Sequence, residues 1–455
     1  MASAATFLSL FLLFLSSSIP ISHQQPPLNS AEQDSLYQVL SSINSDIPWR
    51  TLYPDDLCLS APHGVVCDYF IDQQQPNSSN ISDSDLIIAH ITELSFGYVS
   101  DYTPNAPCSS NSTLHPLLFT SFKYLRKLFF YKCFNETSVS FSNFSSSSFA
   151  DSVEELVFVE NPALVVPLSG IIGNFTNLRR LILTGNGVYG NIPIQIGDLL
   201  SLEEITLSRN RLTGGIPVSV AKLKNLKVVD LSQNLFDGNL PDSLGNLNKI
   251  LKLDLSHNGF SGRIPESLIN LNSLEFLDLS FNRFGNFGIP SFLGEISSLK
   301  EVYMSGNLLG GHIPEKWGKL GGISAIGFSN MGLIGKIPSS MGVYLRNLSY
   351  LRLDNNSLEG EVPKELGFLE LANEINLENN NLSGKIPFTV RVGQKLKVKG
   401  NSKLCKDHGK NEGNMDSPVL FKEGNLVSSI SPVEALWSFS LYGFMMMLGF
   451  FAFVV

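Results

Sequence analysis

The sequence predicts an α/β solenoid: a right-handed leucine-rich-repeat superhelix with a parallel concave β-sheet and a disulfide-bonded helical cap at the N-terminus. Three observations predict it. The pattern L-x-x-L-x-L-x-x-N-x-x-x-G-x-I-P-x-x-L-G-x-L returns every 24 or 25 residues between about Val153 and Leu404, a period typical of leucine-rich repeats. An asparagine recurs in nearly every copy, from Asn161 to Asn401. Nine I-P, L-P or V-P pairs keep the same spacing, from Pro193 to Pro387.

A single copy of this repeat cannot bury its own apolar face, so neighbouring copies must stack and share one continuous core. Each asparagine lies where the strand turns away, and its amide can satisfy backbone groups that the turn leaves unpaired. Two further strand cores, Leu125–Phe130 and Ile91–Phe96, precede the regular copies, which gives twelve or thirteen strands in all. Such a solenoid is a binding surface rather than a reaction vessel.

The pattern breaks at two places. The recurring asparagine marks what we call the ladder position of each repeat. Met331 occupies this position between Asn307 and Asn356, and Asn330 stands one residue early. One extra residue stands in the turn between Asn282 and Pro290.

We divide the chain into five parts. An apolar run followed by serines predicts a secretory signal peptide over 1–22. A cap follows over 23–89, then the repeats over 90–404, a polar linker over 405–434, and an apolar segment over 435–455.

The cap begins with a predicted helix, because Leu36, Val39, Leu40 and Ile43 follow i, i+3, i+4, i+7 spacing. Trp49 is expected to pack against it. In an oxidising compartment we expect two disulfides, Cys58–Cys67 and Cys108–Cys133, because each pair is near in sequence and the exposed end of the core must be sealed. A zinc site is the competing interpretation, but the cysteine spacings do not fit known ligand pairs. Cys405 has no evident partner within the chain.

Nine N-x-S/T sequons agree with export to the cell surface and predict a glycoprotein. They are Asn77, Asn80, Asn111, Asn135, Asn143, Asn174, Asn347, Asn355 and Asn381.

The C-terminal segment, Ala435–Val455, is a run of 21 residues without charge, long enough to cross a bilayer. Two interpretations stay open: a glycolipid-anchor signal that is removed, or a retained single span. Either would attach the chain to the extracellular face of the plasma membrane, with no room for a kinase domain beyond it.

Composition and motifs exclude several function classes. A net charge of −9 with 16% charged residues leaves no footprint for nucleic acid. No catalytic, metal or cofactor motif is present, so we expect neither an enzyme nor a cofactor. Asp230, Asp254 and Asp278 fall at one position of three successive copies. They could form a carboxylate site, but their shared L-D-L-S context is typical of the repeat consensus.

The variable positions of the strands offer a better candidate, a binding patch on the concave face. Aromatic residues and arginine on an exposed face are the types that dominate interface energetics, although scattered exposed aromatics are also normal. The patch comprises Phe276, Glu301, Tyr303, Tyr350 and Arg352, with Phe281 alongside.

Several segments resemble a known family. Glu32–Tyr37, Tyr53–Cys58 and His63–Cys67 resemble the cap of plant receptor-like proteins. Ile91–Gly97, together with Cys108 and Leu128–Cys133, is similar to the branch of TOO MANY MOUTHS and, more so, of Piriformospora indica-insensitive protein 2. The early Asn330 fits that branch too, whereas the lone Cys405 departs from caps that often hold a second cysteine. The resemblance implies a kinase-less cell-surface protein that works beside leucine-rich-repeat receptor kinases and secreted peptides, or in the response to a root-colonising fungus.

Three functions are therefore compared. The first is a membrane-attached receptor-like protein that binds a secreted peptide or microbial ligand and signals, in development or in the response to microbes, through a receptor kinase. The second is an extracellular inhibitor of microbial cell-wall hydrolases, and the third is a structural matrix protein. The apolar tail favours the first, because an inhibitor of the wall needs no anchor.

Overall fold

The computed structural model describes residues 26–60, 62–72, 86–97, 105–140, 150–172, 175–387 and 390–405, all within one compact unit that ends at Asp407. The expected signal peptide, most of the linker and the apolar tail lie outside these residues. Within the described ranges, no helix is both long and apolar enough to span a bilayer.

The cap starts with the expected helix, α2 (Ser30–Ile43), which Asn29 caps by accepting hydrogen bonds from the backbone N–H groups of Ala31 and Glu32. Its four predicted apolar residues are fully buried, and Trp49 is only 4% exposed. Two short helices, α3 (Trp49–Leu52) and α4 (Leu57–Ser60), and a 3₁₀ turn, η1 (Pro62–Gly64), complete the helical part of the cap. The structure joins Cys58 to Cys67 and Cys108 to Cys133, and Cys405 is free and exposed.

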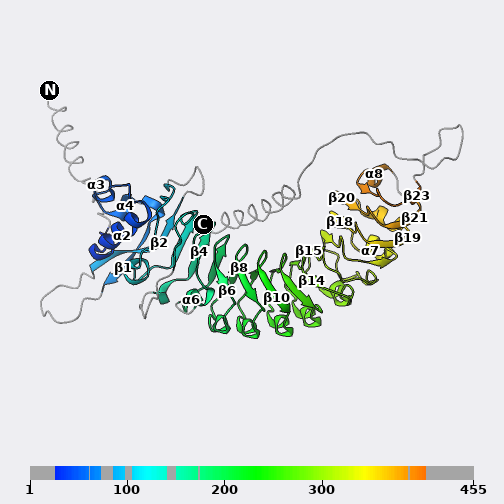
Figure 1. The fold of residues 1–455 in the computed structure, drawn as a ribbon, viewed down its shortest axis with the longest axis horizontal. Coiled ribbons are helices and arrows are strands. Elements are labelled where there is room, and N and C mark those ends of the chain that lie inside the picture. Colours follow the sequence, from blue (N-terminus) through cyan, green and yellow to red (C-terminus); the bar gives the residue numbers. More distant parts are fainter. Residues whose placement is uncertain are drawn as a thin grey trace, which may run out of the picture. The chain divides into compact units, whose positions relative to one another are not determined.

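One large sheet runs through the described part of the chain and has fourteen strands. Each strand after β2 pairs in parallel with the strand of the preceding repeat, at one strand per repeat (Figure 1). In sheet order the strands are β1 (Val66–Asp72), β2 (Leu86–Phe96), β3 (Lys127–Tyr131), β4 (Glu155–Val159), β5 (Arg180–Thr184), β7 (Glu204–Thr206), β9 (Val228–Asp230), β11 (Lys252–Asp254), β13 (Phe276–Asp278), β15 (Glu301–Tyr303), β16 (Ala325–Gly327), β18 (Tyr350–Arg352), β20 (Glu374–Asn376) and β22 (Leu396–Lys397).

The first strand departs from the expected architecture. β1 lies inside the segment assigned to the helical cap, and it pairs antiparallel with β2. The other thirteen strands run parallel, which agrees with the expected twelve or thirteen. The cap therefore closes the sheet with a hairpin strand as well as with helices.

Two smaller sheets, which the repeat pattern did not predict, flank the large one. The first contains β6 (Tyr189–Gly190), β8 (Arg211–Gly214), β10 (Leu235–Asn239), β12 (Gly259–Gly262) and β14 (Arg283–Phe284). The second contains β17 (Ile334–Gly335), β19 (Ser357–Glu361), β21 (Asn381–Lys385) and β23 (Lys403–Cys405). The interval between β14 and β17 holds both breaks in the repeat pattern.

Short helical turns follow the proline positions and lie on the outer side of the row of repeats in Figure 1. They are η3 (Ile194–Asp198), η4 (Val218–Lys222), η5 (Asp242–Asn246), η6 (Glu266–Asn270), η7 (Ser291–Glu295), α7 (Ser339–Tyr344) and η8 (Lys364–Phe368). The irregular early repeats and the last one carry α5 (Leu117–Thr120), η2 (Ala150–Ser152), α6 (Leu168–Ile172) and α8 (Val390–Gly393).

The side chains of the ladder asparagines form hydrogen bonds to backbone groups, as the sequence predicted. In a typical copy, the Asn234 side-chain amide donates to the carbonyl oxygens of Leu207 (2.9 Å) and Leu231 (3.1 Å). Its carbonyl oxygen accepts from the backbone N–H of Leu212 in the preceding repeat (3.1 Å). Each asparagine therefore joins two repeats through backbone groups that would otherwise be buried without partners.

The residue before the ladder position adopts a left-handed conformation in most repeats. Examples are Arg209 (φ 56°), His257 (φ 54°) and Phe281 (φ 53°), whereas Gly185 and Gly306 fill the position elsewhere. Asn330, one residue before Met331, also has a positive φ, of 53°. The early asparagine thus fits this turn position, which asparagine tolerates better than most residues.

Candidate binding surface

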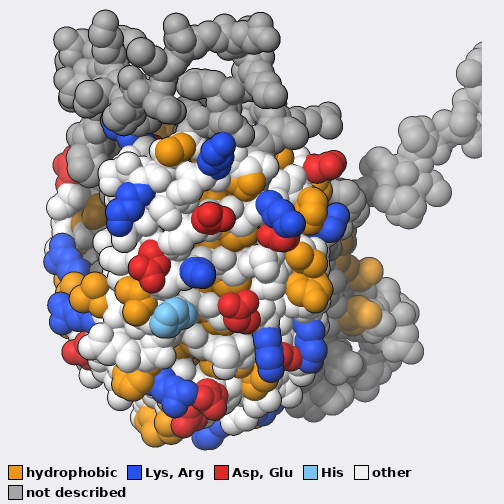
Figure 2. Space-filling view, turned by 90° about the vertical axis from the view of Figure 1, so that its right-hand side faces the viewer, with side chains coloured by type: hydrophobic (Ala, Val, Ile, Leu, Met, Phe, Trp, Pro, Cys, Tyr) orange, Lys and Arg blue, Asp and Glu red, His pale blue; other side chains and the backbone are white. Residues whose placement is uncertain are grey.

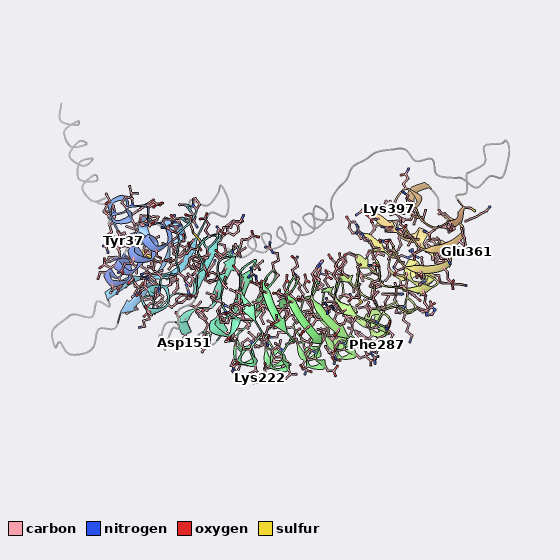
Figure 3. All side chains as sticks on the ribbon, viewed as in Figure 1. Tyr37, Asp151, Lys222, Phe287, Glu361 and Lys397 are labelled. Atoms are coloured by element: carbon pink, nitrogen blue, oxygen red, sulfur yellow. A yellow bond between two sulfur atoms is a disulfide. The ribbon has the colours of Figure 1, made fainter. Side chains whose placement is uncertain are left out.

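The concave face of the large sheet displays every second strand residue, because side chains alternate across a strand. In β13, Leu277 points into the core and is fully buried, whereas Phe276 and Asp278 stand on the concave face and are half-buried. Figure 3 shows Lys222 and Phe287 on the outer, lower side of the row of repeats, away from this face. The six residues of the expected patch can be placed on this frame.

Phe276, Glu301 and Tyr303 lie together. The rings of Phe276 and Tyr303 have their centroids 5.8 Å apart, and the Tyr303 hydroxyl donates to Glu301 Oε2 at 2.9 Å. Burial, with the Glu301 carboxylate as the next cause, raises the pKa of Tyr303, so this phenol stays protonated. The ring also lies over Gly327 of the next strand, where a Cβ would come within 2.7 Å of Tyr303 Cδ1. A glycine at 327 therefore makes room for the aromatic ring.

Phe281, at the edge of the face, also has its ring against a glycine of the next repeat. Its ring stacks on His257 with centroids 4.4 Å apart. A Cβ on Gly306, one repeat later, would be 2.6 Å from Phe281 Cδ1. Phe281 is 51% exposed, so its outer surface is available to a partner.

Tyr350 and Arg352 belong to β18 and lie further along the wall. The strand between them and Tyr303 is β16, whose concave residues are the small Ala325 and Gly327. Tyr350 is 47% exposed, and Arg352 Nε lies 3.3 Å from Glu374 Oε1. The patch thus consists of two groups on one wall, separated by a strand with small side chains.

An acidic column, defined as Asp230, Asp254 and Asp278, stands beside the first group. The three residues are paired in register across β9, β11 and β13. Lys252 Nζ lies 2.8 Å from Asp230 Oδ2 and 3.8 Å from Asp254 Oδ2. Burial and the charges of its two neighbours raise the pKa of Asp254 to about 7, and burial raises the pKa of Asp278 to about 6.

The sequence pattern assigned this column to the repeat consensus, and the predicted patch did not include Lys252, His257 or the two supporting glycines, Gly306 and Gly327. One feature of the sequence did indicate the glycine at position 327. The L-D-L-S context of the earlier copies becomes I-G-F-S around Gly327, at the point where the preceding copy carries a tyrosine.

The predicted glycosylation sites divide into two groups. Asn111, Asn135, Asn347, Asn355 and Asn381 are described, and all five are exposed. Asn77, Asn80, Asn143 and Asn174 lie outside the described residues. Glycosylation at these positions stays a prediction.

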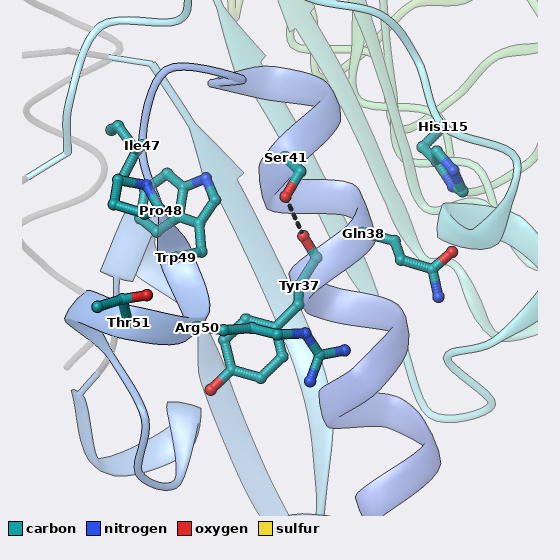
Figure 4. Close-up of a pocket in the computed structure, with 9 residues that line it drawn as sticks. All are labelled: Tyr37, Gln38, Ser41, Ile47, Pro48, Trp49, Arg50, Thr51 and His115. Atoms are coloured by element: carbon teal, nitrogen blue, oxygen red, sulfur yellow. Dashed lines mark hydrogen bonds between the residues drawn. The ribbon is translucent and has the colours of Figure 1, made fainter.

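Other sites are less suited to ligand chemistry. A shallow, open pocket of about 460 Å³ lies on the cap beside Tyr37 and Trp49 (Figure 4). Its Arg50 is already engaged, 2.9 Å from Asp34 and 4.4 Å from the centre of the Tyr37 ring. Among the described side chains, no group of three or more His, Cys, Asp or Glu residues could hold a metal ion. On the face drawn in Figure 2, basic and acidic side chains are interspersed without a continuous basic stripe.

Comparison with known proteins agrees with the fold and with the resemblance that the motifs indicated. Residues 168–371 match the family described as leucine-rich repeat region. Piriformospora indica-insensitive protein 2 of Arabidopsis thaliana is 34% identical over 166 residues, 36% of this chain and 35% of that protein. Protein TOO MANY MOUTHS of Arabidopsis thaliana is 34% identical over 148 residues, 32% of this chain and 26% of that protein. The matches therefore span about a third or less of these relatives.

Among solved structures, the ectodomain of the Arabidopsis receptor kinase HAESA, in complex with an IDA peptide hormone ligand, superposes with a TM-score of 0.54 at 29% identity. That match covers 65% of this chain and 48% of HAESA. The prediction of a leucine-rich-repeat solenoid is confirmed, and so is the resemblance to plant receptor-like proteins.

Proposed function

We propose that this chain, a leucine-rich-repeat protein similar to Piriformospora indica-insensitive protein 2 and TOO MANY MOUTHS, is a receptor-like protein of the plant cell surface. It binds an extracellular peptide or protein on its concave wall and acts together with a receptor kinase. The observation that carries the proposal is the wall itself, a continuous parallel sheet on which the half-buried Tyr303 and the exposed Phe281 stand over glycines. HAESA, whose ectodomain has the same fold, is solved with a peptide hormone.

The sheet supplies a rigid support for such a ligand. Tyr303 is held between Phe276, Glu301 and the backbone at Gly327, so little side-chain freedom is lost when a partner covers it. Rigid aromatic side chains at low entropic cost are typical of binding hot spots. The apolar tail Ala435–Val455 supports attachment to the outer face of the plasma membrane.

Affinity capture of the full-length chain from plant membranes tests the proposal. We expect a leucine-rich-repeat receptor kinase to be recovered, and Tyr303→Ala and Tyr350→Ala each to weaken its binding by more than about 1 kcal/mol. Both side chains lie outside the core, so secretion and folding should survive. Tyr344→Ala is the matched control, because Tyr344 is 51% exposed but belongs to α7 on the outer side. Wild-type affinity in the Tyr303/Tyr350 double variant would remove the patch from consideration.

An inhibitor of microbial wall hydrolases is the second candidate, because it would use the same concave wall. Recovery of a secreted hydrolase instead of a kinase would favour this function. Phospholipase treatment of intact cells adds a further test of attachment. Release indicates a glycolipid anchor, retention indicates a span, and a protein that is soluble without treatment contradicts both.

A further inference from the structure

The acidic column carries more charge than its turns require. Each aspartate accepts a hydrogen bond at Oδ1 from the backbone N–H two residues later, as Ser256 N donates to Asp254 at 3.1 Å. Asn376 stands in the same column three repeats further on from Tyr303 and makes the same bond, accepting from Glu378 N at 3.1 Å. An amide therefore satisfies this turn as well as a carboxylate does.

The charge of the column is unfavourable for the isolated fold. Like charges directly opposite one another on neighbouring strands destabilise a sheet. Three aspartates stand in consecutive register and one lysine lies among them, so three negative charges meet one positive charge when all are ionised. When the three carboxylates are ionised, a second cation beside the column would offset this excess of negative charge.

Lys252 shows what kind of cation this face accommodates. Its ammonium lies between Asp230 and Asp254, and 5.5 Å from the centre of the Phe276 ring. Carboxylates with an aromatic face beside them favour an organic cation. The next pair of carboxylates in the column, Asp254 and Asp278, stands in the same strand register as Asp230 and Asp254. There the residue that corresponds to Lys252 is Phe276.

This second pair of carboxylates, Asp254 and Asp278, also has aromatic side chains beside it. Tyr303 follows Asp278 in the column, and its hydroxyl is directed to Glu301. A side-chain ammonium or guanidinium suits this pair of carboxylates, because aromatic faces stand beside them.

We propose that the wall from β11 to β15 binds an extended polypeptide segment and receives one of its lysine or arginine side chains between Asp254 and Asp278, beside Phe276 and Tyr303. The inference rests on the proposed function and names the ligand chemistry of that surface. A pattern in the sequence supports it independently. No N-x-S/T sequon occurs between Asn174 and Asn347, so the repeats that form this wall carry no glycan attachment that would obstruct a protein ligand.

The test uses the purified full-length chain and acetylated heptapeptide pools, in which the central residue is fixed and the others are randomised. We expect pools centred on arginine or lysine to bind at least tenfold more tightly than pools centred on citrulline or norleucine. Citrulline keeps the shape of arginine without its charge. The preference should weaken at high salt, because it is electrostatic.

Variants locate the effect on the protein. Asp254→Asn combined with Asp278→Asn should abolish the preference for a basic centre and keep the fold, because asparagine preserves the turn as Asn376 does. Asp237→Asn is the control, since Asp237 is exposed on β10 outside the column. Retained preference in the double variant overturns the inference. So does equal binding of all pools, but equal binding that Tyr303→Ala weakens would leave the proposed function standing.

Discussion

Two neighbouring stretches of the wall arrange their charges differently: β4 to β9, called here the first half, and β9 to β13, called the second half. From β4 to β9, charged residues of alternating sign follow one another and pair along the stack. Glu203 receives Arg179 and Lys227 on its two sides, at 2.6 Å each. Arg180 lies 3.4 Å from Glu155 and 2.9 Å from Glu204.

From β9 to β13 the column repeats one sign instead. Asp230, Asp254 and Asp278 share one lysine, and aromatic side chains replace the next partners along the stack. The charges named in the first half are paired with one another, whereas the column in the second half holds three carboxylates beside one lysine. The comparison suggests that the first half serves stability and the second half serves binding.

Charge reversal in the first half should give the largest effect on stability. Arg180→Glu would place three carboxylates side by side in β4, β5 and β7, where the arginine is only 28% exposed. Loss of two ion pairs plus like-charge repulsion should lower the free energy of unfolding by about 2 kcal/mol or more. Denaturant unfolding measures this change.

The control for this variant is Arg211→Glu, which reverses an exposed arginine on β8. It should change stability by less than about 0.5 kcal/mol. If Arg180→Glu were equally mild, the charge pairing of the first half would not be a source of stability, and the contrast between the halves would fail.

Removal of a charge from the second half should instead raise the free energy of unfolding. The pKa of Asp254 is raised to about 7 from an ordinary value of 3.8, so between these two pH values the folded chain holds a proton that the unfolded chain has released. The associated stability is fully present below about pH 4 and is lost as pH rises through about 7. Asp254→Asn should therefore stabilise the fold at pH 8, by on the order of 2 kcal/mol, and change little at pH 4.

Unfolding curves of wild type and Asp254→Asn at both pH values measure this difference, with Asp237→Asn as control. Equal stabilisation at pH 4 and pH 8 would show that the substitution acts by packing rather than by charge.

The sequence predicts the stacking of the repeats well, because the apolar period and the ladder asparagines depend on residues within each copy. It predicts the flanking sheets poorly. The short strand Arg211–Gly214 exists because Tyr189 and Leu235 pair with it from neighbouring repeats, and no local pattern encodes that pairing. The hairpin strand Val66–Asp72 was missed for a similar reason, since its partner begins fourteen residues later, at Leu86.

The residues of the candidate patch stay a prediction from the sequence, and their grouping on the wall is what the structure adds. Aromatic residues at variable strand positions identified Tyr303 and Tyr350. Their separation by β16, and the support of Tyr303 by Gly327, depend on which strands are neighbours and on how far a ring reaches across a register position. The raised pKa of Asp254 likewise depends on burial, which sequence spacing does not reveal.

The smallest expected effect belongs to Glu203, and it sharpens the comparison by its pH dependence. Hydrogen bonds from Lys227 and then from Arg179 lower the pKa of Glu203 below its ordinary value of 4.5. A depressed carboxyl pKa contributes stability that is present above the ordinary pKa and is lost as pH falls through the folded value. Both partners are about half exposed, so Glu203→Gln should lower stability at pH 7 by less than about 1 kcal/mol.

That loss should shrink in 0.5 M salt, which screens exposed ion pairs, and should vanish at low pH, where wild-type Glu203 is protonated as well. Glu315→Gln, an exposed substitution on the outer turn, should show neither trend. At neutral pH, Glu203→Gln should therefore have its largest destabilising effect, whereas Asp254→Asn should stabilise the fold. If the two variants instead responded to pH with the same sign, the halves of the wall would not differ in their charge balance, and the assignment of one to stability and the other to binding would have to be abandoned.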